Sequence, residues 1–108
     1  MSSVAVTSRS FSRHPELRAL VLERYSDVKF NDEGLSLHGN SLIEFLSGYE
    51  KAITALEVID DSILSQLPNL KVIAKYGVGL DMIDLHALKN MELGLVVQEE
   101  LINVLFLS

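Results

Sequence analysis

The residues of this chain best suited to chemistry lie in one short stretch, KYGVGLDMID, residues 75–84. Gly77 and Gly79 follow an apolar run, so successive backbone N–H groups can turn toward one point without a Cβ to block an anion. Lys75 can add a positive charge and Tyr76 a hydroxyl. This pattern suits the binding of a small carboxylate. The simpler interpretation, a tight turn between a strand and a helix, is favoured when Gly-Val-Gly is taken alone.

The stretch does not fit the known phosphate-binding loops. A Walker loop needs a longer glycine spacing that ends in Gly-Lys-Ser/Thr, and a dinucleotide fingerprint needs a third glycine. The net charge of −6 and the scattered lysines and arginines argue against a nucleic-acid or anionic-membrane partner. The chain has no cysteine, which excludes disulfides and thiolate zinc sites, and no metal-ligand spacing stands out.

The chain also shows no targeting or spanning segment. Its start, MSSVAVTSRS, lacks the charged region and apolar region of a secretory signal, and no apolar run is long enough to cross a bilayer. We therefore expect a soluble, cytoplasmic protein that does not bind membranes.

The 108 residues are enough for one domain, and 48% of them are apolar, which is enough for a real core. Short apolar runs alternate with segments of helical period, an order typical of parallel strands with right-handed crossovers. We expect a flavodoxin-like, doubly wound α/β fold with a five-stranded parallel sheet of order 2-1-3-4-5. Such sheets bind ligands beyond the carboxyl ends of their strands, where residues 77–79 would lie. The predicted strands are residues 3–8, 27–30, 51–56, 71–76 and 93–97.

Polar residues predict where several helices begin. Pro15 suits the first turn of one helix, and Ser41 with Glu44 fits a capping box for the next. Asp60 or Asp61 would cap a short helix, and Asp84 another.

Two adjoining segments resemble one family. AITALEVIDDSILSQL and LPNLKVIAKYGVGLDMIDLHALKNMELG are similar to the D-isomer-specific 2-hydroxyacid dehydrogenases, the family of phosphoglycerate and D-lactate dehydrogenases. The resemblance is specific over about residues 51–94. It implies a substrate-binding half-domain that packs across a cleft from an NAD-binding Rossmann domain. The partner would be a small 2-hydroxy or 2-oxo acid.

The resemblance also assigns site residues. The amides of Gly77, Val78 and Gly79 would hold the substrate carboxylate, and Lys75 and Tyr76 would line the cleft. A second substrate-facing loop would contain Leu56 and Glu57. Many relatives have a serine or threonine and an arginine in that loop, so the sequence ALE argues against phosphate-bearing substrates.

The family's other motifs have no counterpart in this chain. We find no match for its G-x-G-x-x-G loop, ribose-binding acid, catalytic arginine, acidic partner or catalytic histidine. His14, His38 and His86 lie outside any family motif, and we expect capping or solvated roles for them. We therefore assign no catalytic, cofactor-binding or metal-binding residue. NAD or NADP would serve the intact family enzyme, and we expect no tight binding by this chain.

The last residues depart from the family, which has a motif like T-x-G-V-N-x-x-S-V-x-E after the fifth strand. Gln98 to Ser108 can be encoded so that the frame one nucleotide earlier reads T-G-G-V-N-K-R-S-V-S-E. Our hypothesis is a frameshifted, truncated dehydrogenase, with residues 1–97 as the substrate-binding half-domain and 98–108 as an atypical tail. The coding DNA tests this hypothesis, because bases that cannot be read as the motif in the neighbouring frame would end it.

Two functions therefore remain open. The first is the substrate-binding domain of an NAD-dependent oxidoreductase that acts on the CH–OH group of D-2-hydroxy acids, inactive alone without its Rossmann domain. The alternative is a non-catalytic truncated remnant, a folded module that forms homo-oligomers through its tail or an uncovered face. Stand-alone receiver and flavodoxin modules fit poorly. A receiver needs an acidic pair after the first strand, and TSRSFSRHPE lacks the glycine of a flavin phosphate loop.

Overall fold

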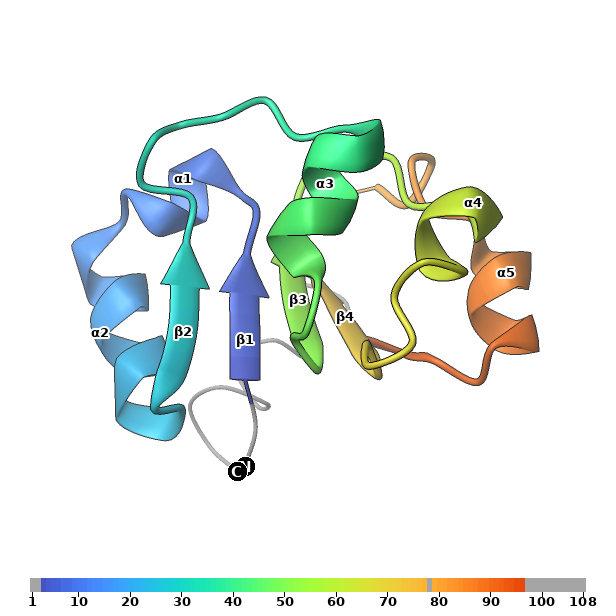
Figure 1. The fold of residues 1–108 in the computed structure, drawn as a ribbon. Helices are drawn as coiled ribbons and strands as arrows, with labels where there is room; N and C mark the ends of the chain where they lie inside the picture. Colours follow the sequence, from blue (N-terminus) through green and yellow to red (C-terminus); the bar gives the residue numbers. More distant parts are fainter. Residues whose placement is uncertain (1–2, 78, 97–108) are drawn as a thin grey trace.

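The computed structural model describes residues 3–77 and 79–96. Within them, five parallel strands form one sheet of order β2-β1-β3-β4-β5, with helices on both faces (Figure 1). The predicted α/β class and strand order are confirmed. The assignments made for Val78 and for residues 98–108 lie outside the described residues. The strands are β1 (Ser3–Val6), β2 (Asp27–Phe30), β3 (Lys51–Thr54), β4 (Val72–Lys75) and β5 (Gly94–Val96).

The helices divide between the two faces of the sheet. Those on one face, α3, α4 and α5, pack on Ala5, Ala52 and Ile73 of the central strands. On the opposite face, Phe11 and Val21, from α1 and α2, pack on the residues that alternate with these, such as Ile53. The alternation follows from the two-residue period of a strand, which sends neighbouring side chains to opposite faces. The helices are α1 (Arg9–Ser12), α2 (Pro15–Arg24), α3 (Gly39–Leu46), α4 (Asp61–Leu64) and α5 (Leu85–Asn90).

Burial decreases toward the edges of the sheet. All of β1 is buried, and so are the last three residues of β3 and of β4. The edge strands β2 and β5 contain only half-buried and exposed residues. The strand β5 is less covered than the central strands although its residues are apolar, because a strand at the edge has a neighbour on one side only.

Side-chain caps fix the starts of the helices. Asp60 accepts a hydrogen bond from the Ile63 amide at 3.1 Å and thereby caps α4, as predicted. The Ser62 hydroxyl and this amide hold the pKa of the Asp60 carboxyl below its usual range. Asp84 caps α5 in the same way, accepting from the Ala87 amide at 3.0 Å.

Two local predictions about helices were wrong or incomplete. The capping box of Ser41 with Glu44 does not form, because α3 begins at Gly39 and the Ser41 hydroxyl instead bonds the backbone of His38. The helix α1 was not predicted. Its four residues are too few to show a helical period, and it depends on Ser8, whose hydroxyl accepts from the Phe11 amide at 3.1 Å.

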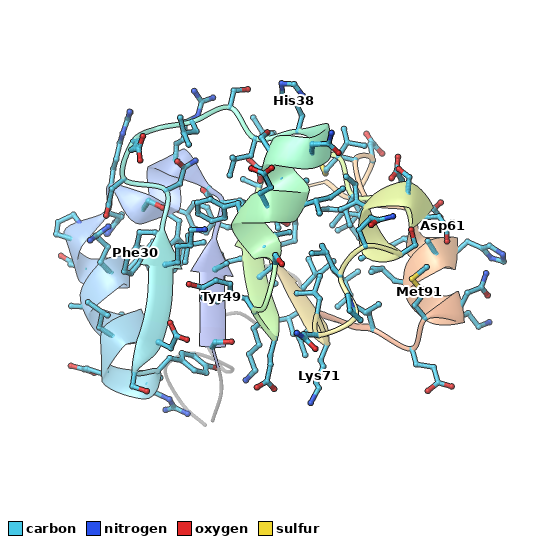
Figure 2. The ribbon with its side chains drawn as sticks, viewed as in Figure 1. Phe30, His38, Tyr49, Asp61, Lys71 and Met91 are labelled. Carbon is cyan, nitrogen blue, oxygen red and sulfur yellow. The ribbon has the colours of Figure 1, made fainter. Side chains whose placement is uncertain are left out.

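The two ends of the sheet carry different groups. Figure 2 shows His38 beyond the carboxyl ends of the strands and Lys71 at the opposite end. Because β1, β3 and β4 are parallel neighbours, the loops that follow them all begin at the carboxyl end of the sheet.

Candidate functional site

A pocket of about 380 Å³ opens at the carboxyl ends of β1, β3 and β4. Three segments form its wall: the start of α1, the loop after β3, and the end of β4 with the turn after it. The structure thus brings together five of the seven residues predicted for the site. The pocket is lined by Arg9, Ser10, Ala55, Leu56, Glu57, Lys75, Tyr76 and Gly77.

Lys75 is the most unusual of these residues, because its side chain is buried and charged. It is 1% exposed, and its Nζ donates to the backbone carbonyl of Tyr76 at 3.3 Å. No carboxylate among residues 3–77 and 79–96 forms an ion pair with it. A buried cation normally has a counter-charge, so this ammonium can bind an anion at the pocket.

Gly77 lies directly against this ammonium. A Cβ built at Gly77 would lie 3.3 Å from Lys75 Nζ. The backbone of Gly77 has φ 115° and that of Gly79 has φ 87°, conformations that favour glycine. Gly79 is exposed and does not line the pocket. The turn therefore requires its glycines for backbone reasons, and at Gly77 also because space is limited.

A second buried polar group lies beside Lys75. Thr54 is its register partner on β3, so the two side chains leave the sheet on the same face. The Thr54 hydroxyl is fully buried and has no hydrogen-bond partner within the described part of the chain. On this face of the sheet, β3 and β4 carry apolar core residues along their length and polar residues at their carboxyl ends.

Tyr76 lines the pocket and also makes a contact outside it. Its side chain lies on the other face, where its ring meets Phe11 edge-on with centroids 5.1 Å apart. Tyr76 therefore lines the pocket but also anchors α1 to the end of β4. No hydrogen bond of its hydroxyl occurs among the described residues.

Glu57 and Leu56 form the wall after β3. One carboxylate oxygen of Glu57, Oε1, accepts from the Thr7 hydroxyl at 2.7 Å and from the Ala55 amide at 2.9 Å. These bonds hold the carboxylate against the strand ends, and Glu57 remains half-buried. Leu56 points to solvent and is 74% exposed.

A backbone bridge ties the two predicted loops together. Ile59 and Ile83 pair as an isolated parallel bridge, with hydrogen bonds of 2.9 Å from the Ile59 amide to Met82 and 2.8 Å from the Asp84 amide to Ile59. The position of Asp84 is thus structural, as the sequence suggested. Asp81 is exposed and bonds no loop amide among the described residues.

Sequence reasoning did not select Arg9, Ser10 or Ala55 for the pocket. These residues could have been found from the rule that the carboxyl ends of parallel strands meet at one edge of the sheet. The segment TSRS directly follows β1 and so begins at that edge. The prediction weighed that segment only against flavin and receiver loops.

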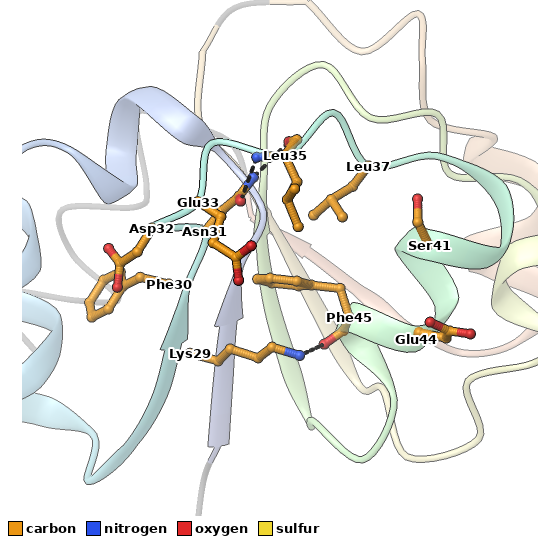
Figure 3. Close-up of a pocket in the computed structure, with 10 residues that line it drawn as sticks. All are labelled: Lys29, Phe30, Asn31, Asp32, Glu33, Leu35, Leu37, Ser41, Glu44 and Phe45. Carbon is orange, nitrogen blue, oxygen red and sulfur yellow. Dashed lines mark hydrogen bonds between the residues drawn. The ribbon is translucent and has the colours of Figure 1, made fainter.

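A larger cavity of about 590 Å³ lies between the end of β2 and α3 (Figure 3). Two of its polar side chains, Asn31 and Lys29, are already bonded within the chain. Asn31 donates to the carbonyls of Thr7 and Leu35, both at 2.9 Å, and accepts from the Leu35 amide. Lys29 Nζ donates to the Phe45 carbonyl at 3.2 Å and lies 4.2 Å from the centre of its ring. These groups hold the loop after β2 in place, so the smaller pocket is the better candidate site.

No group of three or more acidic or histidine side chains among the described residues could hold a metal ion. None of the helices in residues 3–77 and 79–96 is long and apolar enough to cross a membrane.

The fold and the pocket together define a doubly wound α/β domain with its open site at the strand ends, where such domains bind small ligands. The chain belongs to the D-isomer specific 2-hydroxyacid dehydrogenase family: the profile of that family's catalytic domain matches residues 4–99. A search of curated proteins found no match.

Solved structures show the same fold. One is a protein described as a D-isomer specific 2-hydroxyacid dehydrogenase, NAD-binding, from Polaromonas sp. JS6 66, with 25% identity and a TM-score of 0.80 over 88% of this chain. Apo D-lactate dehydrogenase from Escherichia coli has 19% identity and a TM-score of 0.72 over 90% of the chain. NAD⁺-bound 3-phosphoglycerate dehydrogenase from Entamoeba histolytica has 18% identity and a TM-score of 0.71 over 89%. The chain spans 29%, 30% and 32% of these three structures.

The residues present do not fit a dinucleotide. The fingerprint requires a third glycine three residues after the second, and the pair Gly77 and Gly79 is followed there by Met82. We therefore derive no chemical step through NAD from this chain.

Proposed function

We propose that residues 1–97 are the substrate-binding half-domain of an NAD- or NADP-dependent dehydrogenase of D-2-hydroxy acids. In the proposal, the 2-hydroxy or 2-oxo acid binds at the pocket that contains Lys75, Tyr76 and Gly77. Lys75 supplies the positive charge for the acid's carboxylate, and the turn at residues 77–79 supplies backbone donors. Leu56 and Glu57 form the facing wall.

The single observation that carries the proposal is the buried ammonium of Lys75 beside Gly77, which forms no ion pair with any carboxylate that the structure describes. Burying a charge without a counter-charge costs free energy, and a bound anion would offset that cost for the ammonium of Lys75. A carboxylate bound next to Gly77 would form a charge-assisted hydrogen bond with Nζ in a site shielded from water. Family membership supports the same substrate class.

The experiment is a titration of the chain with D-lactate and pyruvate, followed by heteronuclear NMR of the Gly77 amide. We expect the Lys75→Met variant to bind either acid at least about tenfold more weakly, because a hydrogen bond to a charged group contributes about 1.5–3 kcal/mol. We also expect the variant to remain folded, since methionine is apolar and of similar length.

Lys71→Met is the matched control. Lys71 is an exposed lysine at the opposite end of the sheet (Figure 2), where it pairs with Glu50 at 3.5 Å. Its replacement makes the same change in net charge and should leave acid binding unchanged. Acid-induced shifts that persist in Lys75→Met, or none in the unmodified chain, would reject the proposal.

The second candidate is a non-catalytic, self-associating module, and one feature favours it. A hollow of about 230 Å³ lies on the sheet face that carries α1 and α2, at the side of β4 and β5. Its lining is almost entirely apolar: Val4, Tyr25, Lys51, Ala52, Ile53, Val72, Ala74 and Val96. Assembly into a homo-oligomer through this hollow or the tail stays a prediction, as do the cytoplasmic location and the atypical origin of residues 98–108.

A further inference from the structure

We propose that Glu57 determines specificity at this pocket: it rejects acids with a second negative group and selects acids with an uncharged, hydroxyl-bearing tail. The inference rests on the proposed function, because it takes the 2-hydroxy acid's carboxylate to lie at Lys75 and Gly77. It adds which kind of tail the rest of the pocket accepts.

The first step is the position of Glu57 relative to the proposed carboxylate site. The sheet order places β3 between β1 and β4, so the loop after β3 lies between Lys75 on one side and Arg9 on the other. Neighbouring strands are about 4.8 Å apart. A small acid held at Lys75 and Gly77 therefore extends its tail along the wall formed by Leu56 and Glu57.

The second step is that no cation within the described residues pairs with the Glu57 carboxylate at this wall. Within the described residues Glu57 accepts hydrogen bonds from two neutral donors, the Thr7 hydroxyl and the Ala55 amide, which orient a carboxylate without offsetting its charge. Neither Arg9 nor Lys75 forms an ion pair with Glu57, although all three line the same pocket. A phosphate or second carboxylate in the tail would thus meet a half-buried charge of the same sign, whose effect water screens less than that of the exposed Arg9.

The third step is that the wall offers both donors and acceptors. Arg9 is exposed and makes no ion pair with any residue that the structure describes, and Ser10 lies beside it. Tail hydroxyls can donate to Glu57 while they accept from Arg9 or Ser10. An apolar tail would displace water from these groups without replacing its hydrogen bonds, which favours a hydroxylated tail over an alkyl one.

The test compares three acids of equal chain length that differ in the tail alone: D-2-hydroxybutyrate, D-malate and D-erythronate. Binding to the full chain is measured by NMR titration at one ionic strength. We expect D-erythronate to bind tightest and D-malate weakest, about tenfold below D-2-hydroxybutyrate, because like charges in contact are strongly unfavourable.

The Glu57→Gln variant removes the charge of the side chain and nearly keeps its shape, so it tests the charge alone. The glutamine carbonyl can still accept from Thr7 and Ala55, so the loop should keep its conformation, which the NMR spectrum checks. We expect D-malate to bind about tenfold more tightly to this variant, with D-2-hydroxybutyrate unchanged. Glu23→Gln, on the surface of α2, makes the same change in net charge and should alter none of the three.

Two failures are distinguishable. If D-malate binds the unmodified chain as tightly as D-2-hydroxybutyrate, or if Glu57→Gln leaves D-malate unchanged, the specificity role is wrong and the proposed function stands. If none of the acids shifts the Gly77 amide, the carboxylate site itself is wrong.

Discussion

At the scale of single residues, the pocket combines groups that a stable core would avoid. Lys75 is buried with one hydrogen bond, and the Thr54 hydroxyl beside it has none among the described residues. Polar groups left in this state reduce the stability of a fold. Their position where β3 and β4 end, at the edge where such sheets bind ligands, argues for a functional reason rather than a packing reason.

The substitution Gly77→Ala tests whether the position of the Lys75 ammonium depends on the space left by the glycine. Gly77→Ala should lower the free energy of unfolding by about 1–2 kcal/mol, because a side chain at positive φ is strained. The new Cβ would lie 3.3 Å from Lys75 Nζ, so it should also displace the ammonium and weaken acid binding. Urea unfolding measures the stability and NMR titration measures the binding.

Gly48→Ala is the matched control for this substitution. Gly48 has φ 86°, with no atom within 4 Å of a Cβ built there, and it lies outside the pocket. It should lose a similar amount of stability without any change in acid binding. Equal binding by both variants would show that Lys75 does not depend on the space at Gly77.

At the scale of elements, the end of α5 contains a left-handed residue that is not glycine. The amide of Glu92 bonds the Lys89 carbonyl at 3.1 Å and that of Leu93 bonds the Leu88 carbonyl at 2.9 Å, the pattern of a Schellman motif. In this motif Glu92 occupies the position that usually holds glycine, with φ 57°. The turn is needed because it sends the chain from α5 into β5.

Replacement of Glu92 by glycine should therefore stabilise the chain. We expect Glu92→Gly to raise the free energy of unfolding by about 0.5–1 kcal/mol, since relief of the strain exceeds the added entropy of the unfolded chain. Lys89→Gly, inside the same helix, should instead lower it by about 0.5–1 kcal/mol. A loss of stability in Glu92→Gly would mean that the glutamate side chain makes a contact worth more than the strain.

The sequence allowed the elements to be predicted better than the site. The five strands and their order follow from apolar runs and crossovers, which need only local composition and handedness. The capping box at Ser41 was wrong because Ser41 and Glu44 have the right spacing, while the loop after β2 delivers the chain into a helix that begins earlier, at Gly39. Arg9 was missed because its place in the pocket depends on α1, and α1 depends on the contact of Phe11 with Tyr76.

At the scale of the whole molecule, the described part of the chain presents a polar edge of the sheet and an apolar hollow. The edge carries the proposed acid site, and the hollow is the feature that favours the self-associating alternative. The two features share no proposed role, so acid binding and assembly can be tested separately. Acid binding should respond to Lys75 and Glu57, whereas assembly should respond to residues of the hollow such as Val72.

Both candidate functions predict that this chain alone turns over no substrate, which a mixture of the chain with NADH and a panel of 2-oxo acids tests. Hydride transfer needs a nicotinamide held against the substrate carbon and a nearby group that moves a proton. No dinucleotide fingerprint occurs in the sequence, and the polar side chains at the pocket are those of Arg9, Ser10, Glu57, Lys75 and Tyr76. We therefore expect no oxidation of NADH above background, even at acid concentrations that saturate the Gly77 amide shift. Oxidation that disappears in Lys75→Met would show that this chain catalyses the reaction alone. Oxidation that survives Lys75→Met, and that is absent from a preparation made without the chain, would reject the role of Lys75 in holding the acid.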